Sequence, residues 1–563
     1  SPALYAAGRK LSMFSVPRLH PHLPRRRVAG SMIALGVLAM GLSVIGGEVA
    51  DAEDVIHVSP SGSDKASGDG NDPVQTVARA VKMASPGDTV VLASGTYHET
   101  VQVYAKEVHI TAAPGADAVF DGARQVGGWT PRSGAWTAPW STDFERSGAP
   151  FTLAERPEAG WPEQFWVAGV ELTEARNRSD LGPGFFYYDR AADLVWIDDD
   201  PRGQLVEGSA LMSALYLNGA DGSSISNVTV RRYATPTRGM AAVRAYANNL
   251  VLTDVTVEDN AFVGVSMMGN NISIDGMVTR RNGHLGVHAH LSKGITITDS
   301  VIEANNAKGF DGFHSAGGFK VTESSNIEVS HTRVSGNNGP GLWTDLGTVD
   351  IELIGNWVDG NTRSGIEIEL SSRAVIAGNT VVNNGETGVW VLESGDVDVW
   401  HNALFDNYRD VWVEEGPRSD VRRVAVVNNT MGGSSGAPAI LNVDDWTEER
   451  SAKQMNVELR SNRYWLPAGS PTLNISRWAN WPRPIALSPT IGEHISATSG
   501  DQNASVSRTS SNPYIRSASD TRPPSGSSLG VAVTSSIAEA LGLNGGQVFP
   551  AGPVQPFGAA GGR

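Results

Sequence analysis

Residues 361–369 read Asn-Thr-Arg-Ser-Gly-Ile-Glu-Ile-Glu: a turn that contains Asn, then a Gly, then a short strand in which apolar and polar residues alternate. Six further segments repeat this pattern at steps of 22 to 24 residues, apart from one step of 32 residues. Their turn residues are Asn260, Asn282, Asn305, Asn337, Asn384 and Asn407. A period this short, made of strands and turns without a helix, predicts an all-β solenoid of the parallel β-helix type, in which each repeat forms one coil.

Composition and charge narrow the possible functions. The chain has no Cys, which excludes disulfides and thiolate metal sites. It carries 44 basic and 60 acidic residues, and its net charge of −16 argues against nucleic acid as a partner and mildly against polyanionic substrates.

The first 52 residues have the features of a secretory signal. Three arginines at 25–27 precede an uncharged, apolar run over residues 28–47, and small residues at Ala50 and Ala52 follow. This order predicts a signal peptide that is cleaved after Ala52, and therefore a secreted or periplasmic protein without a stable membrane span. An uncleaved membrane anchor is the alternative, although the run is barely long enough to cross a bilayer.

Changes in pattern divide the remaining chain into four parts. Residues 53–123 contain an expected strand at 55–58 and a helix near 74–84, which we interpret as an N-terminal cap followed by the first coils. Residues 124–210 break the coil pattern, hold six of the fifteen tryptophans, and predict an inserted small β unit whose tryptophans form a core or bind sugars. The parallel β-helix is expected over residues 211–480, and an irregular C-terminal tail over residues 481–563.

The opening segment, with its strand, its loop rich in Gly, Asp and Ser, its helix and the Pro86-Gly87-Asp88 turn, resembles the start of the pectate-lyase-like proteins. Those proteins are right-handed parallel β-helices that act on polysaccharides. The resemblance extends to the coils of residues 211–430. It implies right-handed coils and a polysaccharide or oligosaccharide substrate.

Strand alternation predicts which side chains face outward. Residues one and three positions after each coil Gly are mostly apolar and should point inward, so those two and four positions after it should point outward. The second-position column then contains Ser266, His288, Asp311, Trp343, Glu367 and Trp390, and the fourth-position column contains Met268, His290, Phe313, Asp345, Glu369 and Leu392. Histidines, carboxylates and aromatic residues gather on this strip, which we interpret as a groove that binds and converts a substrate.

Two carboxylates on this strip form a candidate catalytic pair. Asp345 and Glu369 occupy one column in adjacent coils, so their carboxyl groups should lie roughly 5 Å apart, the separation used by retaining glycosidases. Glu367 adds a third carboxylate, and mutual repulsion should raise at least one pKa, as a general acid requires. Outward carboxylates that only keep the surface solvated are the alternative interpretation.

A second resemblance assigns roles to this pair. Gly339-Pro-Gly-Leu-Trp-Thr-Asp345 and Ser364-Gly-Ile-Glu-Ile-Glu-Leu-Ser371 resemble the paired coils of β-helical glycosidases related to β-xylosidases. The resemblance implies that Asp345 is the nucleophile and Glu369 the acid/base, and it leaves the sugar open.

The one long step in the repeat predicts an insertion at about residues 310–327. Gly317 and Gly318 permit a tight excursion over the strip, which would bring His314 or Lys320 to the substrate, unless the insertion is an ordinary surface loop. His288 and His290 are expected to donate hydrogen bonds to the substrate. A metal site formed by these two His and Asp345 is the less favoured alternative, because the coil of Phe313 separates them. The turn asparagines are expected to be structural, because Asn tolerates turn geometry and can pair along stacked coils.

Three functions remain open at the level of sequence. The leading hypothesis is a secreted, retaining glycoside hydrolase that acts on plant or microbial glycans without a cofactor. The second is a polysaccharide lyase or uronate epimerase, in which carboxylates hold Ca²⁺ and Lys320 or a His abstracts a proton. The third is a non-catalytic, glycan-binding surface solenoid.

Overall fold

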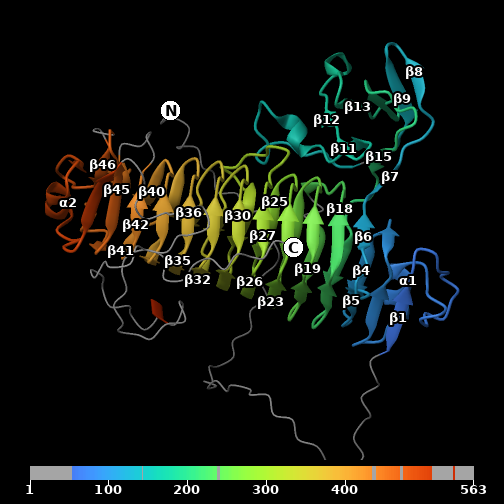
Figure 1. Cartoon of the computed structure of the whole chain (residues 1–563), viewed down its shortest axis with the longest axis horizontal. Helices are drawn as coiled ribbons and strands as arrows, with labels where there is room; N and C mark the ends of the chain where they lie inside the picture. The colour runs from blue at the N-terminus through green and yellow to red at the C-terminus, as the bar shows by residue number, and fades with distance from the viewer. Residues whose placement is uncertain are drawn as a thin grey trace, which may run out of the picture. The chain divides into compact units, whose positions relative to one another are not determined.

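The computed structural model describes residues 54–142, 144–237, 241–433, 439–469, 473–509 and 537–538. These residues form a solenoid of three sheets with thirteen strands each, drawn in Figure 1 as a row of coils. The predicted signal peptide, residues 1–52, lies outside the described residues. Among the described residues, no helix is both long and apolar enough to span a membrane.

We call the sheet that contains Asp345 and Glu369 sheet 1. Adjacent strands within it run parallel, except that β46 and β47 are antiparallel. Its strands are β4 Val101–Tyr104, β16 Leu215–Asn218, β19 Ala241–Tyr246, β22 Val263–Met267, β25 Leu285–His290, β28 Gly317–Thr322, β31 Leu342–Asp345, β34 Ile366–Glu369, β37 Thr387–Leu392, β40 Arg409–Glu415, β43 Ala439–Asp445, β46 Asn474–Trp478 and β47 Ala486–Ser488.

Sheets 2 and 3 complete each coil, and the chain passes from sheet 1 to sheet 2 to sheet 3 in every regular turn. Sheet 2 contains β1 Val55–Val58, β2 Thr89–Leu92, β5 His109–Ala112, β17 Ser224–Ser226, β20 Val251–Thr253, β23 Asn270–Asp275, β26 Lys293–Thr298, β29 Ser325–Ser330, β32 Val349–Ile354, β35 Ser372–Ala377, β38 Gly395–Trp400, β41 Arg422–Val427 and β44 Val457–Arg460. Sheet 3 contains β3 Gly95–Tyr97, β6 Ala118–Asp121, β18 Val228–Arg231, β21 Thr256–Glu258, β24 Val278–Arg280, β27 Val301–Glu303, β30 Arg333–Ser335, β33 Trp357–Asp359, β36 Thr380–Val382, β39 Ala403–Phe405, β42 Thr430–Gly432, β45 Arg463–Pro467 and β48 Ser505–Thr509.

The interior of the solenoid is a column of apolar side chains. Val287, Leu342, Ile366 and Val389, each one position after a coil Gly, are fully buried in the main core, as the alternation predicted. Removal of these side chains from water is the main force that holds the coils together.

The turn asparagines form a buried ladder, which confirms their structural interpretation. Each side-chain amide donates to the Asn carbonyl of the next coil, at 2.9 to 3.0 Å, from Asn260 through to Asn407. The coil Gly makes room for this ladder: a Cβ on Gly365 would lie 2.7 Å from Nδ2 of Asn384. The pairing of Asn and Gly in the repeat therefore has a steric cause.

Both ends of the solenoid carry a short helix. Helix α1, Val77–Met83, begins after the cap residue Thr76 and buries Val77, Ala80 and Val81 in the main core, in agreement with the predicted cap. Helix α2, Ile491–Thr498, begins with a capping box between Thr490 and Glu493. The expectation of an irregular tail from residue 481 was wrong over 486–509, where β47, α2 and β48 form. Backbone pairing to β46 and β45 holds β47 and β48. The buried His494 of α2 lies within hydrogen-bond distance of Ser476 and Asp501.

Residues 123–209 form two small sheets of their own, drawn in teal at the upper right of Figure 1. One contains β7 Ala123–Gln125, β10 Phe165–Val167, β11 Val170–Glu171 and β15 Val206–Ser209; the other contains β8 Thr130–Arg132, β9 Ala135–Pro139, β12 Thr173–Glu174, β13 Phe185–Asp189 and β14 Leu194–Ile197. Two 3₁₀ turns, Pro157–Gly160 and Arg178–Asp180, lie between the strands. Trp140 is buried in the apolar core of this unit, and Trp129 and Trp136 pack against that core, so these three tryptophans are structural.

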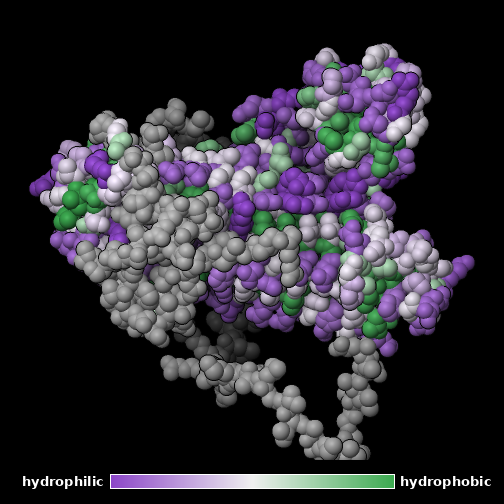
Figure 2. All heavy atoms as spheres, in the orientation of Figure 1, coloured by the Kyte–Doolittle hydropathy of each residue, from purple (hydrophilic) through white to green (hydrophobic). Residues whose placement is uncertain are grey.

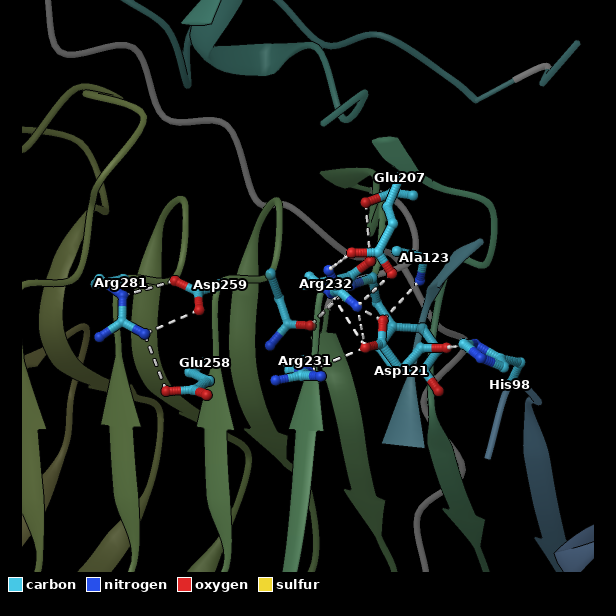
Figure 3. Close-up of polar contacts among 12 residues, drawn as sticks. His98, Asp121, Ala123, Glu207, Arg231, Arg232, Glu258, Asp259 and Arg281 are labelled. Atoms are coloured by element: carbon cyan, nitrogen blue, oxygen red, sulfur yellow. Dashed lines mark hydrogen bonds and ion pairs between the residues drawn. The ribbon is translucent and has the colours of Figure 1, made fainter. Parts of the chain in front are cut away.

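Charged side chains fix the base of the inserted unit to the solenoid (Figure 3). Asp121, at the end of β6, accepts hydrogen bonds from Arg231 and from Arg232, and Arg232 also donates to Glu207 on β15. The chain enters the unit after β6 and leaves it through β15, so this cluster ties both connections to one point.

Candidate active site

The coil that follows Asn305 differs from its prediction. Gly309 does not begin a strand of sheet 1; residues 304–316 form a loop, and the strand is β28, whose Phe319 pairs with Val287 and Leu342. The coil Gly is Gly318, because a Cβ there would lie 3.0 Å from Nδ2 of Asn337, the next residue of the ladder. The alternation of Gly-Phe-Lys-Val-Thr at 318–322 was the signal that could have placed the strand.

This register changes two members of the outward columns. Asp311 and Phe313 leave the columns for the loop, and Lys320 and Thr322 take their places. Paired residues of the second-position column are Ser266, His288, Lys320, Trp343, Glu367, Trp390 and Trp412, and those of the fourth-position column include His290, Thr322, Asp345, Glu369, Leu392 and Glu414. Lys320 therefore reaches the strip from a strand, and not through an excursion of the loop.

Asp345 ends β31 and is only 6 % exposed. Its Oδ2 lies 2.9 Å from Nζ of Lys320, and its Oδ1 accepts a hydrogen bond of 2.7 Å from the backbone N–H of Leu346. A cation and an N–H donor thus stabilise negative charge on this carboxylate.

Glu369 ends β34 and is 8 % exposed. Trp343 donates from Nε1 to its Oε2 at 3.0 Å, and Arg418 approaches its Oε1 at 2.7 Å. Burial and then the charge of Asp345 raise the pKa of Glu369, and Lys320 and Arg418 oppose that rise. Each carboxyl of the pair therefore contacts one cation and accepts one N–H donor, and burial raises the pKa of Glu369.

The two carboxyl groups face the same side of adjacent strands. Trp343 pairs with Glu367 and Thr344 pairs with Ile368, so the register brings Asp345 next to Glu369. The spacing of neighbouring strands is about 4.8 Å, and the separation of roughly 5 Å between the two carboxyl groups stays a prediction.

Glu367 lies on β34, two residues before Glu369, and is buried. Burial, followed by the charges of Glu369 and Glu386, raises the pKa of Glu367 to about 8, against the opposing effects of Arg363 and Lys320. Its Oε2 has no hydrogen-bond partner within the described residues. Glu367 and Glu369 therefore both have raised pKa values, and the largest cause is burial and not the mutual repulsion expected from the sequence.

The loop at residues 304–316 packs over Lys320. The ammonium of Lys320 donates to the carbonyl oxygen of His314 at 3.2 Å and lies 3.1 Å from the centre of the Trp343 ring. The His314 ring meets Phe151 of the inserted unit edge to face at 5.3 Å. Asp311 binds the backbone N–H of Phe313 at 2.9 Å and thereby shapes the loop. The inserted unit thus supports a loop that contacts the site.

His288 and His290 lie on β25, one strand before Lys320. Burial, followed by the charges of His290 and Lys320, lowers the pKa of His288 to about 3, so its ring is neutral near pH 7. The Nδ1 atom of His290 lies 2.9 Å from the hydroxyl of Thr322.

Sequence reasoning missed Arg418 and Trp412 at this site. Arg418 comes from the loop after β40, where no repeat marks it, and it bridges Glu369 to the buried Glu393. Trp412 stacks on Trp390 with the ring centres 4.6 Å apart and the planes 4° from parallel. The continuing second-position column could have identified Trp412.

The site does not offer an open set of metal ligands. No group of three or more His, Cys, Asp or Glu suited to a metal ion occurs among the described residues. Asp345 and Glu369 already contact the cations of Lys320 and Arg418. This donor set does not fit the Ca²⁺ of the lyase hypothesis.

Comparisons with known proteins agree with the architecture. The family model described as "Right handed beta helix region" matches residues 241–404, and one described as "Protein of unknown function (DUF1565)" matches residues 60–104. The uncharacterized protein YwoF of Bacillus subtilis (strain 168) is 46 % identical over 50 residues, which are 9 % of this chain and 11 % of that protein.

Solved structures resemble a larger part of the chain. The complex of XylC with xylose has a TM-score of 0.64 at 15 % identity and covers 82 % of this chain and 86 % of that one. The A-module of the mannuronan C-5 epimerase AlgE6 of Azotobacter vinelandii has a TM-score of 0.44 at 14 % identity, with 77 % and 93 % covered. At these identities the likeness concerns the fold, and together with the family model it establishes that the chain is a right-handed parallel β-helix protein.

Proposed function

We propose that this protein is a retaining glycoside hydrolase that acts on xylose-containing oligosaccharides or polysaccharides, with Asp345 as nucleophile and Glu369 as acid/base. One observation carries the proposal: two buried carboxyls face the same side of adjacent strands, one bound to the Lys320 ammonium and one with a raised pKa. Two carboxyls on one face suit a retaining mechanism, and the raised pKa of Glu369 suits the acid/base role.

The geometry supports a two-step reaction. In the first step an oxygen of Asp345 bonds to the anomeric carbon, the glycosidic C–O bond breaks, and the proton of Glu369 passes to the leaving oxygen. In the second step a water molecule gives a proton to Glu369 and attacks the anomeric carbon, and the bond to Asp345 breaks. The configuration at the anomeric carbon is retained because it is inverted twice.

Neighbouring side chains support each role. Lys320 stabilises the charge of Asp345 before attack and again when the carboxylate is released. Trp343 orients the Glu369 carboxyl through its indole N–H. Burial of Glu369 keeps its proton available as the leaving oxygen develops charge. His288, His290 and Trp390 remain proposed substrate contacts on the same face, and Glu367 is proposed to adjust the charge of the site.

The substrate class rests on two resemblances. The paired coils around Asp345 and Glu369 resemble glycosidases related to β-xylosidases, and the XylC structure, of which 86 % is covered, holds xylose. We further propose that the protein is exported, because of the basic and apolar order of residues 25–52.

A panel of substrates tests this function. Aryl β-xylosides and xylo-oligosaccharides should yield new reducing ends, and polygalacturonate should yield no ultraviolet absorbance from unsaturated uronates. Asp345→Asn and Glu369→Gln should each abolish most hydrolysis, and the partly exposed Glu303→Gln should not. Unsaturated products that require added Ca²⁺ would refute the proposal in favour of the lyase.

A further inference from the structure

A cleft lies on sheet 1 beyond the candidate active site, at the C-terminal end of the solenoid. It has a volume of about 670 Å³, and its floor includes Trp412, Asn442 and Asp444 from β40 and β43. Trp446 from the loop after β43 and Trp481 from the loop after β46 also line it. We call it the C-terminal cleft.

The C-terminal cleft continues the columns of the active site. Trp412 and Asn442 extend the second-position column that contains Glu367, and Asp444 extends the fourth-position column that contains Glu369. Three strand steps separate Asp444 from Glu369, a distance of about 14 Å along the sheet. A single sugar ring does not bridge this distance, whereas a chain of several rings does.

The cleft exposes large aromatic surfaces. The side chain of Trp446 is 52 % exposed and that of Trp481 is 45 % exposed, although most tryptophans in the described residues are buried. Figure 2 also shows a hydrophobic patch near α2 at this end of the solenoid, where Ile485 and Leu487 are 44 % and 54 % exposed. Flat, half-exposed rings in a cleft are suited to stacking against the apolar faces of sugar rings.

Buried polar groups in the cleft lack partners. Asn442 is 3 % exposed and its Oδ1 has no hydrogen-bond partner within the described residues. The Nε and one terminal nitrogen of Arg409, which also lines the cleft, lack partners there too. Such groups destabilise a folded protein unless a ligand satisfies them, and a polyhydroxylated ligand supplies both donors and acceptors.

Three of the other charged groups at the cleft, Asp444, Arg450 and Arg477, are paired within the protein, and the exposed Glu448 and Arg483 also line it. Asp444 accepts a hydrogen bond of 3.1 Å from Nε1 of Trp412 and forms an ion pair with Arg477, and Arg450 pairs with Glu415 at 2.5 Å. The guanidinium of Arg409 stacks over the Trp412 ring at 3.8 Å. The cleft therefore offers an amide oxygen, guanidinium N–H donors and exposed indole rings, together with the opposite charges of Glu448 and Arg483, which balance, and this set favours a neutral glycan.

We propose that the C-terminal cleft is a second glycan-binding site, which holds one part of a xylose-containing chain while another part lies at Asp345 and Glu369. The choice of xylose rests on the proposed function, whereas the binding of a neutral glycan rests on the cleft alone. The protein then favours chains long enough to reach both sites.

Binding is tested with the full chain carrying Glu369→Gln, so that turnover does not interfere. Titration calorimetry with xylohexaose, cellohexaose, hexagalacturonate and xylobiose compares this parent with a variant that also carries Trp446→Ala and Trp481→Ala. We expect the affinity for xylohexaose to fall at least tenfold and the affinity for xylobiose to stay unchanged. Tyr104→Ala, which removes a 53 % exposed ring at the other end of sheet 1, serves as the matched control and should change neither affinity.

The outcomes separate the two proposals. If the Trp446/Trp481 variant loses affinity for cellohexaose but keeps its affinity for xylohexaose, and the Tyr104 control keeps both, the cleft is a glycan site but xylose is not its sugar. Equal affinity of parent and variant for every hexasaccharide, or no binding by the parent, overturns the cleft. In the active chain, the same double substitution should raise KM for xylohexaose and leave kcat/KM for an aryl β-xyloside unchanged. Circular dichroism confirms that each variant is folded.

Discussion

Lys320 and Asp345 form a buried ion pair across two strands of sheet 1, with Nζ 2.9 Å from Oδ2. Lys320 is on β28 opposite Trp343, and Asp345 is on β31 opposite Thr322, so the contact runs diagonally between the strands. Each side chain is almost fully buried, and each neutralises a charge that would otherwise be costly at that depth.

The first prediction concerns this pair. Lys320→Met should destabilise the fold by about 3 kcal/mol, because it leaves the buried Asp345 without its cation. The double variant Lys320→Met/Asp345→Asn should recover much of that loss, since no unpaired charge remains. Chemical denaturation measures both effects. Additive losses in the double variant would show that the two side chains do not interact.

The catalytic roles predict different responses to azide. Glu369→Gln should lower kcat on unactivated xylosides by about 10² to 10⁴, the usual range for a general acid/base, and should still form the glycosyl-enzyme from activated aryl xylosides. Azide should then release a glycosyl azide of retained configuration. With Asp345→Asn, azide should give the inverted product. Product configuration is read by NMR, and near-normal rates in both variants would exclude the pair.

Arg418 should set the alkaline limit of activity. Its charge lowers the pKa of Glu369, so Arg418→Gln should raise that pKa further and move the alkaline limb of the kcat/KM profile to higher pH. Arg422→Gln, which removes a more exposed arginine that pairs with Asp396, is the control and should leave the limb in place. An acidic shift with Arg418→Gln would contradict the assignment of Glu369 as the acid.

Metal independence is the fourth prediction. Hydrolysis needs only the two carboxyls, and the cations of Lys320 and Arg418 occupy the place where a metal would be needed for charge balance. Treatment with EDTA should therefore leave the rate on aryl xylosides unchanged. A rate that falls with EDTA and returns with Ca²⁺ would support the lyase hypothesis.

Much of the fold was predictable because the repeat has a local cause. The Asn ladder needs a Gly beside it in each coil, and inward positions such as Val287 and Ile366 must be apolar. The sequence therefore shows both the length of the repeat and which side chains point inward. Asp345, Glu369 and Glu367 were found by that regularity. Asp311 was misplaced because Asn305-Asn-Ala-Lys-Gly309 imitates the turn of a regular coil, although the next strand begins only at Gly317.

Arg418 and the C-terminal cleft could not be found in the same way. Arg418 reaches Glu369 from a loop of no fixed length, and Trp446 and Trp481 come from loops outside the repeat. Contacts of this kind depend on the path of each loop in space. That path cannot be predicted from the repeat length or from the alternation of residues in the strands.

The last prediction concerns stability and pH at Glu367. Burial raises the pKa of Glu367 from its ordinary value of 4.5 to about 8 in the folded protein, so between these values the folded state holds a proton that the unfolded state has lost. The free energy of unfolding therefore falls as pH rises from about 4.5 to 8. Above pH 8 the whole destabilisation caused by the buried, ionised Glu367 remains. Glu367→Gln removes the cost, so its melting temperature should exceed that of the parent at pH 8 and match it near pH 4. Differential scanning calorimetry across this range, with Glu303→Gln as a control for the loss of one carboxylate, measures the effect. A difference from the parent that stays constant at every pH would mean that Glu367 ionises in the folded protein as it does in the unfolded chain.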